Sequence, residues 1–274
     1  MRESEFEFIR NLVYQRSRIC LDVDKREMVT ARLGKRLRAT NLDTVTEYCR
    51  LLQSPQAGEE LSHLIDAIST NHTFFFRENA HFDFVRNQIV PEMRQRLRAE
   101  RWPRFLAWSA ACSSGEEPYS LAITLQEAIE PGWDWHIQCT DISHRILARA
   151  SQAIYREDVI EKIPAPLVKK YFQKGIGPQD GNYRVRAELR QRLAFHQLNL
   201  LESDSPINES FHVIFCRNVM IYFDRPTQEE LVRRLARRLV PGGYLLVGHS
   251  ESLTGLSHPL QLVRPATYRR SPTS

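Results

Sequence analysis

The chain has 274 residues, of which 42% are hydrophobic and 26% are charged, proportions typical of a globular protein and unlike those of disordered or fibrous chains. Neither a membrane-spanning apolar run nor a secretion signal is visible, so we expect a cytoplasmic protein with no direct membrane insertion. The net charge of +5 is compatible with an acidic partner but too small to demand nucleic acid, and five scattered cysteines without a Cys-x-x-Cys pair indicate neither disulfides nor a metal site.

Residues 1–70 have the spacing of helices rather than of strands. Apolar residues recur every four positions at Val29, Leu33 and Leu37. Basic residues occupy a neighbouring side of the same predicted helix, at Arg32, Lys35 and Arg36. We therefore predict a small bundle of short helices over residues 1–70, with one basic helix exposed.

From about residue 100, short apolar runs alternate with helical patterns. The runs that we predict to be strands are 105–108, 135–139, 193–196, 211–215 and 243–247. Strands separated by helical crossovers imply a mostly parallel sheet covered on both faces, with ligands bound beyond the carboxyl ends of the strands. The expected fold class is α/β, with a small N-terminal helical domain (1–70), a linker helix (71–99) and a doubly wound Rossmann-like sheet (100–274).

A turn-rich segment interrupts this alternation. Lys174–Gly181 is rich in glycine, and Tyr183–Arg186 alternates like an exposed strand. We predict a small antiparallel β insertion in the α/β domain, at about residues 173–192.

The first predicted strand runs into a loop of small residues, Ser109–Gly115, which lets backbone approach a ligand closely. The dinucleotide fingerprint Gly-x-Gly-x-x-Gly is absent. Glu116 and Glu117, at the start of the following helix, would repel a pyrophosphate but attract an amine or a sulfonium. The alternative is that both acids only complement the helix dipole.

Asp141 ends the second predicted strand, where an acid can accept hydrogen bonds from ribose hydroxyls. The alternative role for Asp141 is to cap the next helix, for which Ser143 is the competing residue. Together with the acidic helix start, Asp141 favours an adenosine ligand with a positive tail over a dinucleotide.

Two further segments carry candidate functional residues. Asn71–Glu78 contains three consecutive aromatics and Arg77, a candidate for binding a carboxylate, although an interdomain packing cluster is the alternative. Cys216–Phe223 ends another predicted strand. No Pro-Pro follows Asn218, which counts against methylation of nucleic-acid bases, and Cys216 is better explained as a small buried residue than as a nucleophile.

Five strings of residues occur in order along the chain. They are Asn71-x-Thr73-x-Phe75-Phe76-Arg77, Ser113-Ser114-Gly115-Glu116-Glu117-Pro118-Tyr119-Ser120, Asp141-Ile142-Ser143, Asn199-Leu200 and Arg217-Asn218-Val219-Met220-Ile221-Tyr222-Phe223. With the basic helix over 25–38 and the turn Gly248–Glu251, they resemble the CheR family, the chemotaxis receptor glutamate O-methyltransferases that use S-adenosylmethionine. The resemblance implies that residues 100–274 form the methyltransferase domain.

The resemblance also implies roles for individual residues. The cofactor would be bound by Asn71, Thr73, Arg77, Glu117, Asp141, Asn199, Leu200, Arg217 and Asn218. Within this set Asp141 would bind the ribose hydroxyls, and Asn199 with Leu200 would contact the adenine. Glu116 is the alternative to Glu117. The expected catalytic residues are Arg77, which would orient a reactant, and Tyr222, which would face the transferred methyl.

The implied reaction gives glutamate methyl esters and S-adenosylhomocysteine. The implied partner is the acidic, helical cytoplasmic part of methyl-accepting chemotaxis receptors, which would dock on Arg32, Lys35 and Arg36. The β insertion resembles the part of some family members that grips a receptor's C-terminal pentapeptide, here through Gly175, Gly177, Arg186 and Arg190. We expect a monomer that uses no metal and binds no nucleic acid.

Two other functions remain open from the sequence. One is a non-catalytic module that binds S-adenosylmethionine or its product and docks on receptors. The other is a nucleic-acid methyltransferase, which the arginine clusters suggest and the missing Pro-Pro signature disfavours.

Overall fold

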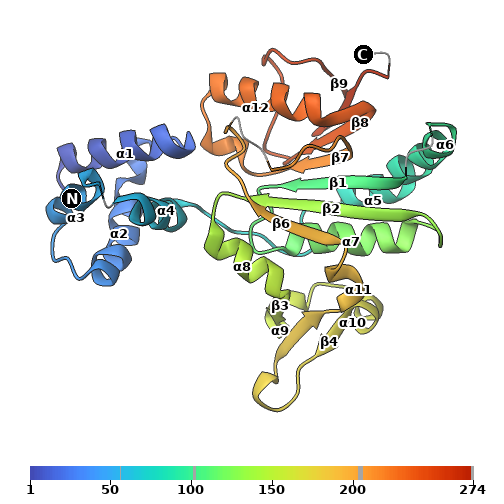
Figure 1. Cartoon of the computed structure of the whole chain (residues 1–274), viewed down its shortest axis with the longest axis horizontal. Helices are drawn as coiled ribbons and strands as arrows, with labels where there is room; N and C mark the ends of the chain where they lie inside the picture. The colour runs from blue at the N-terminus through green and yellow to red at the C-terminus, as the bar shows by residue number, and fades with distance from the viewer. Residues whose placement is uncertain (56, 101–102, 203–205, 273–274) are drawn as a thin grey trace. The chain divides into compact units, whose positions relative to one another are not determined.

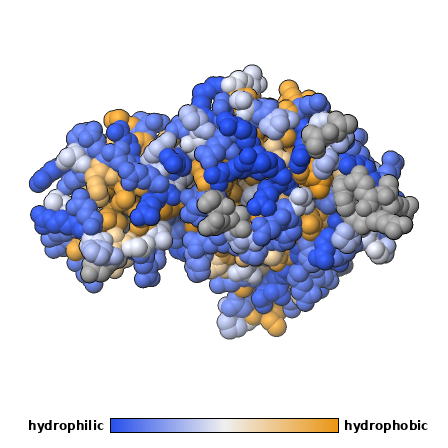
Figure 2. Space-filling view, turned by 45° about the horizontal axis from the view of Figure 1, so that its top comes forward, coloured by the Kyte–Doolittle hydropathy of each residue, from blue (hydrophilic) through white to orange (hydrophobic). Residues whose placement is uncertain are grey.

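The computed structural model describes residues 1–55, 57–100, 103–202 and 206–272 (Figure 1). These residues form two compact units. The first unit contains residues 1–70 and 222–228, and the second contains residues 71–221 and 229–274. Among the described residues, no helix is both long enough and apolar enough to cross a membrane. The face shown in Figure 2 is mostly hydrophilic, with hydrophobic side chains in small scattered groups.

The first unit is built from short helices, as the spacing of its apolar residues predicts. They are α1 (Glu3–Ser17), η1 (Val23–Lys25), α2 (Arg26–Thr40), α3 (Val45–Gln53) and α4 (Ala57–Ile68). Their core is formed by side chains at helical spacing, among them Phe6, Ile9, Val29 and Leu33. The residues 222–228 contribute too, since Asp224 accepts a hydrogen bond of 2.6 Å from the Tyr14 hydroxyl.

The basic side of α2 differs from the prediction. Arg36 donates two hydrogen bonds, of 2.9 and 2.6 Å, to the carboxylate of Glu60 in α4. Arg32 donates to the carbonyl of Ile68 and to the hydroxyl of Thr70, at the end of the same helix. Of the three predicted docking residues, only Lys35 is fully exposed. The expectation of three exposed cations is therefore wrong for Arg32 and Arg36, because both fasten α2 to α4.

The second unit begins with a non-helical linker over 71–79. The predicted linker helix starts only at Ala80, as α5 (Ala80–Phe84), a π-helical segment η2 (Val85–Ile89) and α6 (Val90–Glu100).

A seven-stranded sheet follows, in the order β6-β2-β1-β7-β8-β10-β9. Its strands are β1 (Arg104–Ala110), β2 (Asp134–Asp141), β6 (Leu193–Gln197), β7 (Phe211–Cys216), β8 (Leu239–Val247), β9 (Leu260–Arg264) and β10 (Thr267–Arg270). The first five pair in parallel, which confirms the predicted strands, whereas β9 and β10 are antiparallel and were not predicted.

Three helices connect the parallel strands: α7 (Glu116–Ala128), α8 (His144–Gln152) and α12 (Arg225–Arg238), the last preceded by the short turn η4 (Met220–Tyr222). The crossover through α7 leads from β1 toward one edge of the sheet, and the crossover through α12 leads from β7 toward the other edge. Because such crossovers are right-handed, the two helices cover opposite faces. The sheet is doubly wound, as predicted.

A second, antiparallel sheet has the order β3-β5-β4. Its region contains β3 (Ile154–Arg156), α9 (Glu157–Ile160), α10 (Ala165–Tyr171), β4 (Phe172–Lys174), η3 (Gly177–Gln179), β5 (Asn182–Val185) and α11 (Ala187–Arg190). The predicted insertion is confirmed, but it begins at Ile154 rather than near 173. The strand that we expected to be exposed, β5, lies in the middle of this sheet, so the open edges belong to β3 and β4.

Candidate functional site

Loops converge beyond the carboxyl ends of the parallel strands. The N–H of Cys112, after β1, donates to the carbonyl of Thr140 in β2 at 2.8 Å. The N–H of Leu198, after β6, donates to the carbonyl of Asp141 at 3.0 Å. The segments after β1, β2 and β6 are thus held side by side, where ligands bind in doubly wound sheets.

The loop after β1 has an unusual backbone. Ala111, Ser113 and Gly115 have φ angles of 65°, 50° and 98°, in the left-handed region. A Cβ atom at Gly115 would come within 2.6 Å of the Tyr155 hydroxyl, which donates a hydrogen bond to the carbonyl of Ser114. Tyr155, from the small sheet, therefore holds the loop in place. Small residues are needed here both for the backbone conformation and for close approach.

Asp141 ties two of these loops together. One carboxylate oxygen accepts the N–H of Ser113 at 2.9 Å, and the other accepts the N–H of Ser143 at 3.0 Å. The cap of α8 is Ser143, whose hydroxyl accepts the N–H of Ile146 at 3.1 Å. The capping alternative for Asp141 is therefore wrong, and a ribose contact stays the prediction for this acid.

The linker Asn71–Glu78 packs along this edge of the sheet. The Ser113 hydroxyl donates to the carbonyl of Asn71 at 3.2 Å, and the N–H of Phe76 donates to the Ser120 hydroxyl at 2.8 Å. Phe75 is buried in the core of the second unit, whereas Phe74 is partly exposed under the guanidinium of Arg77. Arg77 itself donates to the carbonyl of His72 at 2.9 Å.

A buried arginine joins the linker to β1, α7 and β7. The side chain of Arg217 is 1% exposed and lies 2.9 Å from a Glu78 oxygen and 3.1 Å from a Glu117 oxygen. It also donates to the backbone carbonyl of Arg77. Glu117 accepts a further hydrogen bond of 2.6 Å from the hydroxyl of Ser109 in β1. One guanidinium thus lies between two acids that would otherwise repel each other.

The two acids respond differently to this guanidinium. Burial favours a high pKa for Glu78, but the charge of Arg217 and the hydrogen bonds outweigh it, so the pKa is below its usual value. At Glu117 burial outweighs Arg217, and the pKa is raised. Burial also raises the pKa of Glu116, the alternative cofactor residue, whose carboxylate accepts the Ser114 hydroxyl at 2.6 Å.

A third buried acid, Glu251, organises the turns after β7 and β8. Its carboxylate accepts the N–H groups of Asn218, Met220 and Gly248, at 2.8, 2.8 and 2.6 Å. Asn218 has a φ of 58°, and a Cβ atom at Gly248 would come within 2.4 Å of its amide nitrogen. Glu251 fixes Asn218 beside Arg217, a role that sequence reasoning missed although it included the turn in the resemblance.

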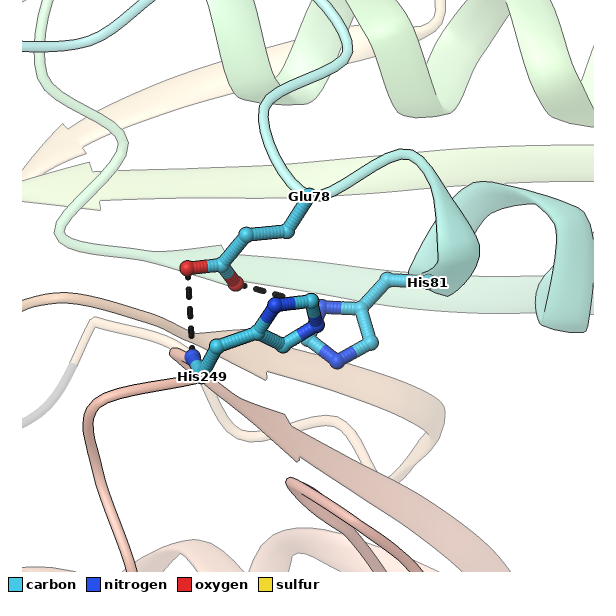
Figure 3. Close-up of side chains that lie close together, drawn as sticks. All are labelled: Glu78, His81 and His249. Carbon is cyan, nitrogen blue, oxygen red and sulfur yellow. Dashed lines mark hydrogen bonds and ion pairs between the residues drawn. The ribbon is translucent and has the colours of Figure 1, made fainter.

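Glu78 also contacts the turn after β8 (Figure 3). Its second oxygen accepts the N–H of His249 at 3.1 Å. The ring of His249 meets the ring of His81 edge-on, with centroids 4.9 Å apart. His81 is 1% exposed, and burial, with the nearby Arg217 charge, lowers its pKa to about 3. Sequence reasoning assigned no role to these three residues.

The other predicted residues lie in several places. Asn199 and Leu200 follow β6, and the side-chain oxygen of Asn199 accepts the N–H of Leu201. Tyr222 belongs to the first unit, where its carbonyl accepts the N–H of Cys20 and its ring lies under Lys25. Cys216 is buried, and burial raises the pKa of its thiol, as expected for a packing residue.

The four residues predicted to grip a receptor's C-terminal pentapeptide lie in different surroundings. Arg186 is exposed, whereas Arg190 donates to the carbonyl of Val185 at 3.0 Å and so supports the small sheet. Gly177 has a φ of 58°. A Cβ atom at Gly175 would overlap the carbonyl of Gln179, so this turn requires glycine.

The donor set of the site fits an adenosine cofactor with a cationic tail. Gly115, in the loop after β1, has no side chain. Asp141 is the last residue of β2, and the side-chain amide of Asn199 follows β6. The acids Glu116 and Glu117 begin α7, where a pyrophosphate would be repelled.

Comparison with known proteins agrees with this arrangement. Residues 71–268 match the family described as "CheR methyltransferase, SAM binding domain", and residues 4–69 match "CheR methyltransferase, all-alpha domain". The chain is 40% identical to the chemotaxis protein methyltransferase of Salmonella typhimurium, covering 99% of this chain and 91% of that protein. It is 38% identical to the one from Borreliella burgdorferi, covering 95% and 92%.

A solved structure of magnesium protoporphyrin IX methyltransferase from Synechocystis with bound SAM aligns with a TM-score of 0.35 and 13% identity, covering 74% of this chain and 100% of that one, a likeness too weak to support an inference. The two family matches together span nearly the whole chain, and the relatives are matched over nearly their whole length. This chain therefore belongs to the CheR methyltransferase family and contains its S-adenosylmethionine-binding domain.

Proposed function

We propose that this protein methylates glutamate side chains of chemotaxis receptors, with S-adenosylmethionine as the methyl donor and S-adenosylhomocysteine as the by-product. The observation that carries the proposal is that four acids of the site are already engaged by protein groups. Glu78 and Glu117 pair with Arg217, and both Asp141 and Glu251 accept backbone N–H groups. None of these four carboxylates is disposed as a general base.

A carboxylate acceptor suits such a site. A glutamate has an unperturbed pKa of about 4.3 and is already an anion at neutral pH, so no proton has to be removed before transfer. An ammonium or hydroxyl acceptor would require a base. When bound, S-adenosylmethionine supplies an electrophilic methyl group that a carboxylate oxygen can accept. The task left to the protein is positioning, which contributes up to about 7–11 kcal/mol in intramolecular models.

The residues that hold the cofactor in this proposal come from five segments. Asp141 accepts hydrogen bonds from the ribose hydroxyls, and Asn199 with Leu200 contacts the adenine. Asn71, Thr73 and Arg77 bind from the linker side. Glu117 lies at the buried end of the pocket, and Arg217 and Asn218 close that end.

Arg77 and Tyr222 are the proposed catalytic residues. Arg77 is half-buried and its guanidinium is held over Phe74 and by the carbonyl of His72, so it presents a fixed cation for orienting a carboxylate. A positioning role suits it better than a tight ion pair, which would lower the nucleophilicity of the carboxylate. Tyr222 would face the transferred methyl and help to exclude water.

Two separate parts of the chain are proposed to contact the receptor, one in each unit. Lys35 on α2 would contact the acidic receptor helices directly, while Arg32 and Arg36 hold α2 in place through their bonds to α4. A receptor C-terminal pentapeptide would add to an open edge of the β3-β5-β4 sheet, near Arg186, with Gly175 and Gly177 shaping the turn. We propose that the protein acts as a monomer in the cytoplasm.

The test mixes the protein with methyl-labelled S-adenosylmethionine and receptor-bearing membranes from the same cell, then adds alkali. Carboxyl methyl esters release labelled methanol in alkali, whereas N-methyl groups do not. We expect methanol from the wild type, almost none from Arg77→Ala, and normal yield from Arg86→Ala, an exposed arginine paired with Asp83. Transfer of an alkali-stable label would refute the proposal, and unchanged turnover in Arg77→Ala would remove Arg77 from the mechanism.

A further inference from the structure

Glu78, His81 and His249 form a cluster of metal-ligating side chains that the proposed reaction does not use as such. Each offers one ligand atom, and these atoms lie within 4.8 Å of one another. Figure 3 shows the two imidazole rings close together beside the Glu78 carboxylate. The residues come from the linker, the start of α5 and the turn after β8, so the cluster exists only in the folded second unit.

His81 is the most unusual member. Its side chain is 1% exposed, and neither ring nitrogen has a hydrogen-bond partner among the described residues. Buried polar side chains are almost always hydrogen-bonded, so an exception calls for a partner that protein atoms do not supply. Nδ1 lies 3.6 Å from a Glu78 oxygen, which is longer than a normal hydrogen bond. A cation between the two would satisfy both.

The spacing of the rings fits a metal ion. Two imidazoles bound to one tetrahedral zinc ion, with Zn–N bonds of about 2.0–2.1 Å, bring their ring centroids to about 5 Å from each other. The centroids of His81 and His249 are 4.9 Å apart and their planes are tilted by 76°. His249 is exposed, which gives an ion a path to the buried ring of His81.

We propose that Glu78, His81 and His249 bind a divalent transition-metal ion of the zinc type, and that this ion competes with Arg217 for Glu78. Two imidazoles and one carboxylate are a common protein ligand set for zinc and leave a fourth position for water. The cluster offers too few oxygens for calcium or magnesium.

The competition follows from the shared carboxylate. The Glu78 oxygen nearest His81 is the one that lies 2.9 Å from Arg217. A doubly charged ion bound there would repel the guanidinium, which is buried and unable to turn toward water. The effect on cofactor binding rests on the proposed role of Arg217 in closing the cofactor pocket: the pocket would loosen, and the metal-loaded protein would bind S-adenosylmethionine more weakly. The metal site itself does not depend on which substrate is methylated.

The first experiment measures binding directly on the full chain after treatment with a chelator. Zinc is titrated calorimetrically, and cobalt(II) is added as a spectroscopic substitute for zinc. We expect one equivalent to bind, an affinity at least tenfold lower in His249→Ala, and no change in His63→Ala, whose exposed imidazole lies in the first unit. Because His249 is exposed and its N–H remains in the variant, folding should not be affected.

Three results would each overturn the site. The first is the absence of stoichiometric binding, and the second is equal affinity in wild type and His249→Ala. The third is a cobalt spectrum with the strong thiolate charge-transfer band of a cysteine site. A second titration, of S-adenosylmethionine with and without zinc, tests the competition: zinc should weaken binding in the wild type and not in His249→Ala. An unchanged cofactor affinity in the zinc-loaded wild type would refute the competition with Arg217.

Discussion

Replacing Arg217 with methionine tests the buried network most directly. The substitution keeps most of the side-chain volume and removes the charge that pairs with both Glu78 and Glu117. Both carboxylates remain in a buried site, along with the unsatisfied carbonyl of Arg77. Removing one partner of a buried ion pair costs about 3–5 kcal/mol of unfolding free energy, because the other charge stays buried without compensation. We expect Arg217→Met to be destabilised by that amount near pH 8.

The loss of unfolding free energy in Arg217→Met should grow as the pH rises. Without Arg217, burial raises the pKa of both carboxyls above the unfolded value of about 4.3. Between that value and the raised folded pKa, unfolding releases protons, so the destabilisation grows as the pH rises. In the wild type the pKa of Glu78 is lowered instead, and its stabilisation is complete above about pH 4.3, while the charge of Arg217 limits the rise that burial causes in the pKa of Glu117. The difference between variant and wild type is therefore smaller at pH 5 than at pH 8.

The assay is urea unfolding followed by tryptophan fluorescence. All four tryptophans lie between residues 102 and 135, so the signal reports on the second unit. Adding Glu117→Gln to Arg217→Met should recover part of the stability at pH 8, because one buried charge disappears. Arg86→Met, which breaks an exposed pair with Asp83, should cost no more than about 1 kcal/mol. A loss below about 1 kcal/mol in Arg217→Met, or an equal loss at both pH values, would refute the reasoning.

Three further predictions concern other parts of the chain. Asp141→Ala should weaken S-adenosylmethionine binding about 10–100-fold in calorimetry, since it removes the charge-assisted hydrogen bonds that we propose to the ribose; unchanged affinity would place the ribose elsewhere. Gly115→Ala should lower unfolding free energy by about 1–3 kcal/mol, because of its φ of 98° and the Tyr155 hydroxyl; a neutral effect in urea unfolding would contradict this. Lys35→Glu should slow receptor methylation at low salt more than at moderate salt, with cofactor affinity unchanged; initial rates that fall equally at both salts would argue against docking there.

Local features of the sequence were enough to predict the parallel strands and to choose the loops at their carboxyl edge as the candidate site. Asp141 ends an apolar run, and the residues of the first loop are small, so strand ends and ligand loops are both visible in short segments. The antiparallel insertion was visible in the same way. Its strand order was not, because alternation in β5 looks the same for an edge strand and for a central strand of a small, half-exposed sheet.

The contacts that complete the site could not be read from the sequence, because their partners are far apart along the chain. Glu78 meets Arg217 across 139 residues and the N–H of His249 across 171 residues. Arg36 illustrates the same limit in the first unit. Its helical position is compatible with a solvated cation, and only the packing of α4 against α2 reveals that it pairs with Glu60.

The backbone of the site supports a positioning role for the buried network. Five of the nine described non-glycine residues with positive φ lie in its segments: Phe76, Glu78, Ala111, Ser113 and Asn218. Such conformations cost free energy and persist only where surrounding contacts fix them. A buried ion pair is likewise weak evidence for stability, since well-packed apolar residues of similar volume often do as well. Both features favour a site whose geometry is fixed before the substrate arrives, which suits the proposed carboxylate acceptor because such an acceptor needs positioning rather than a base.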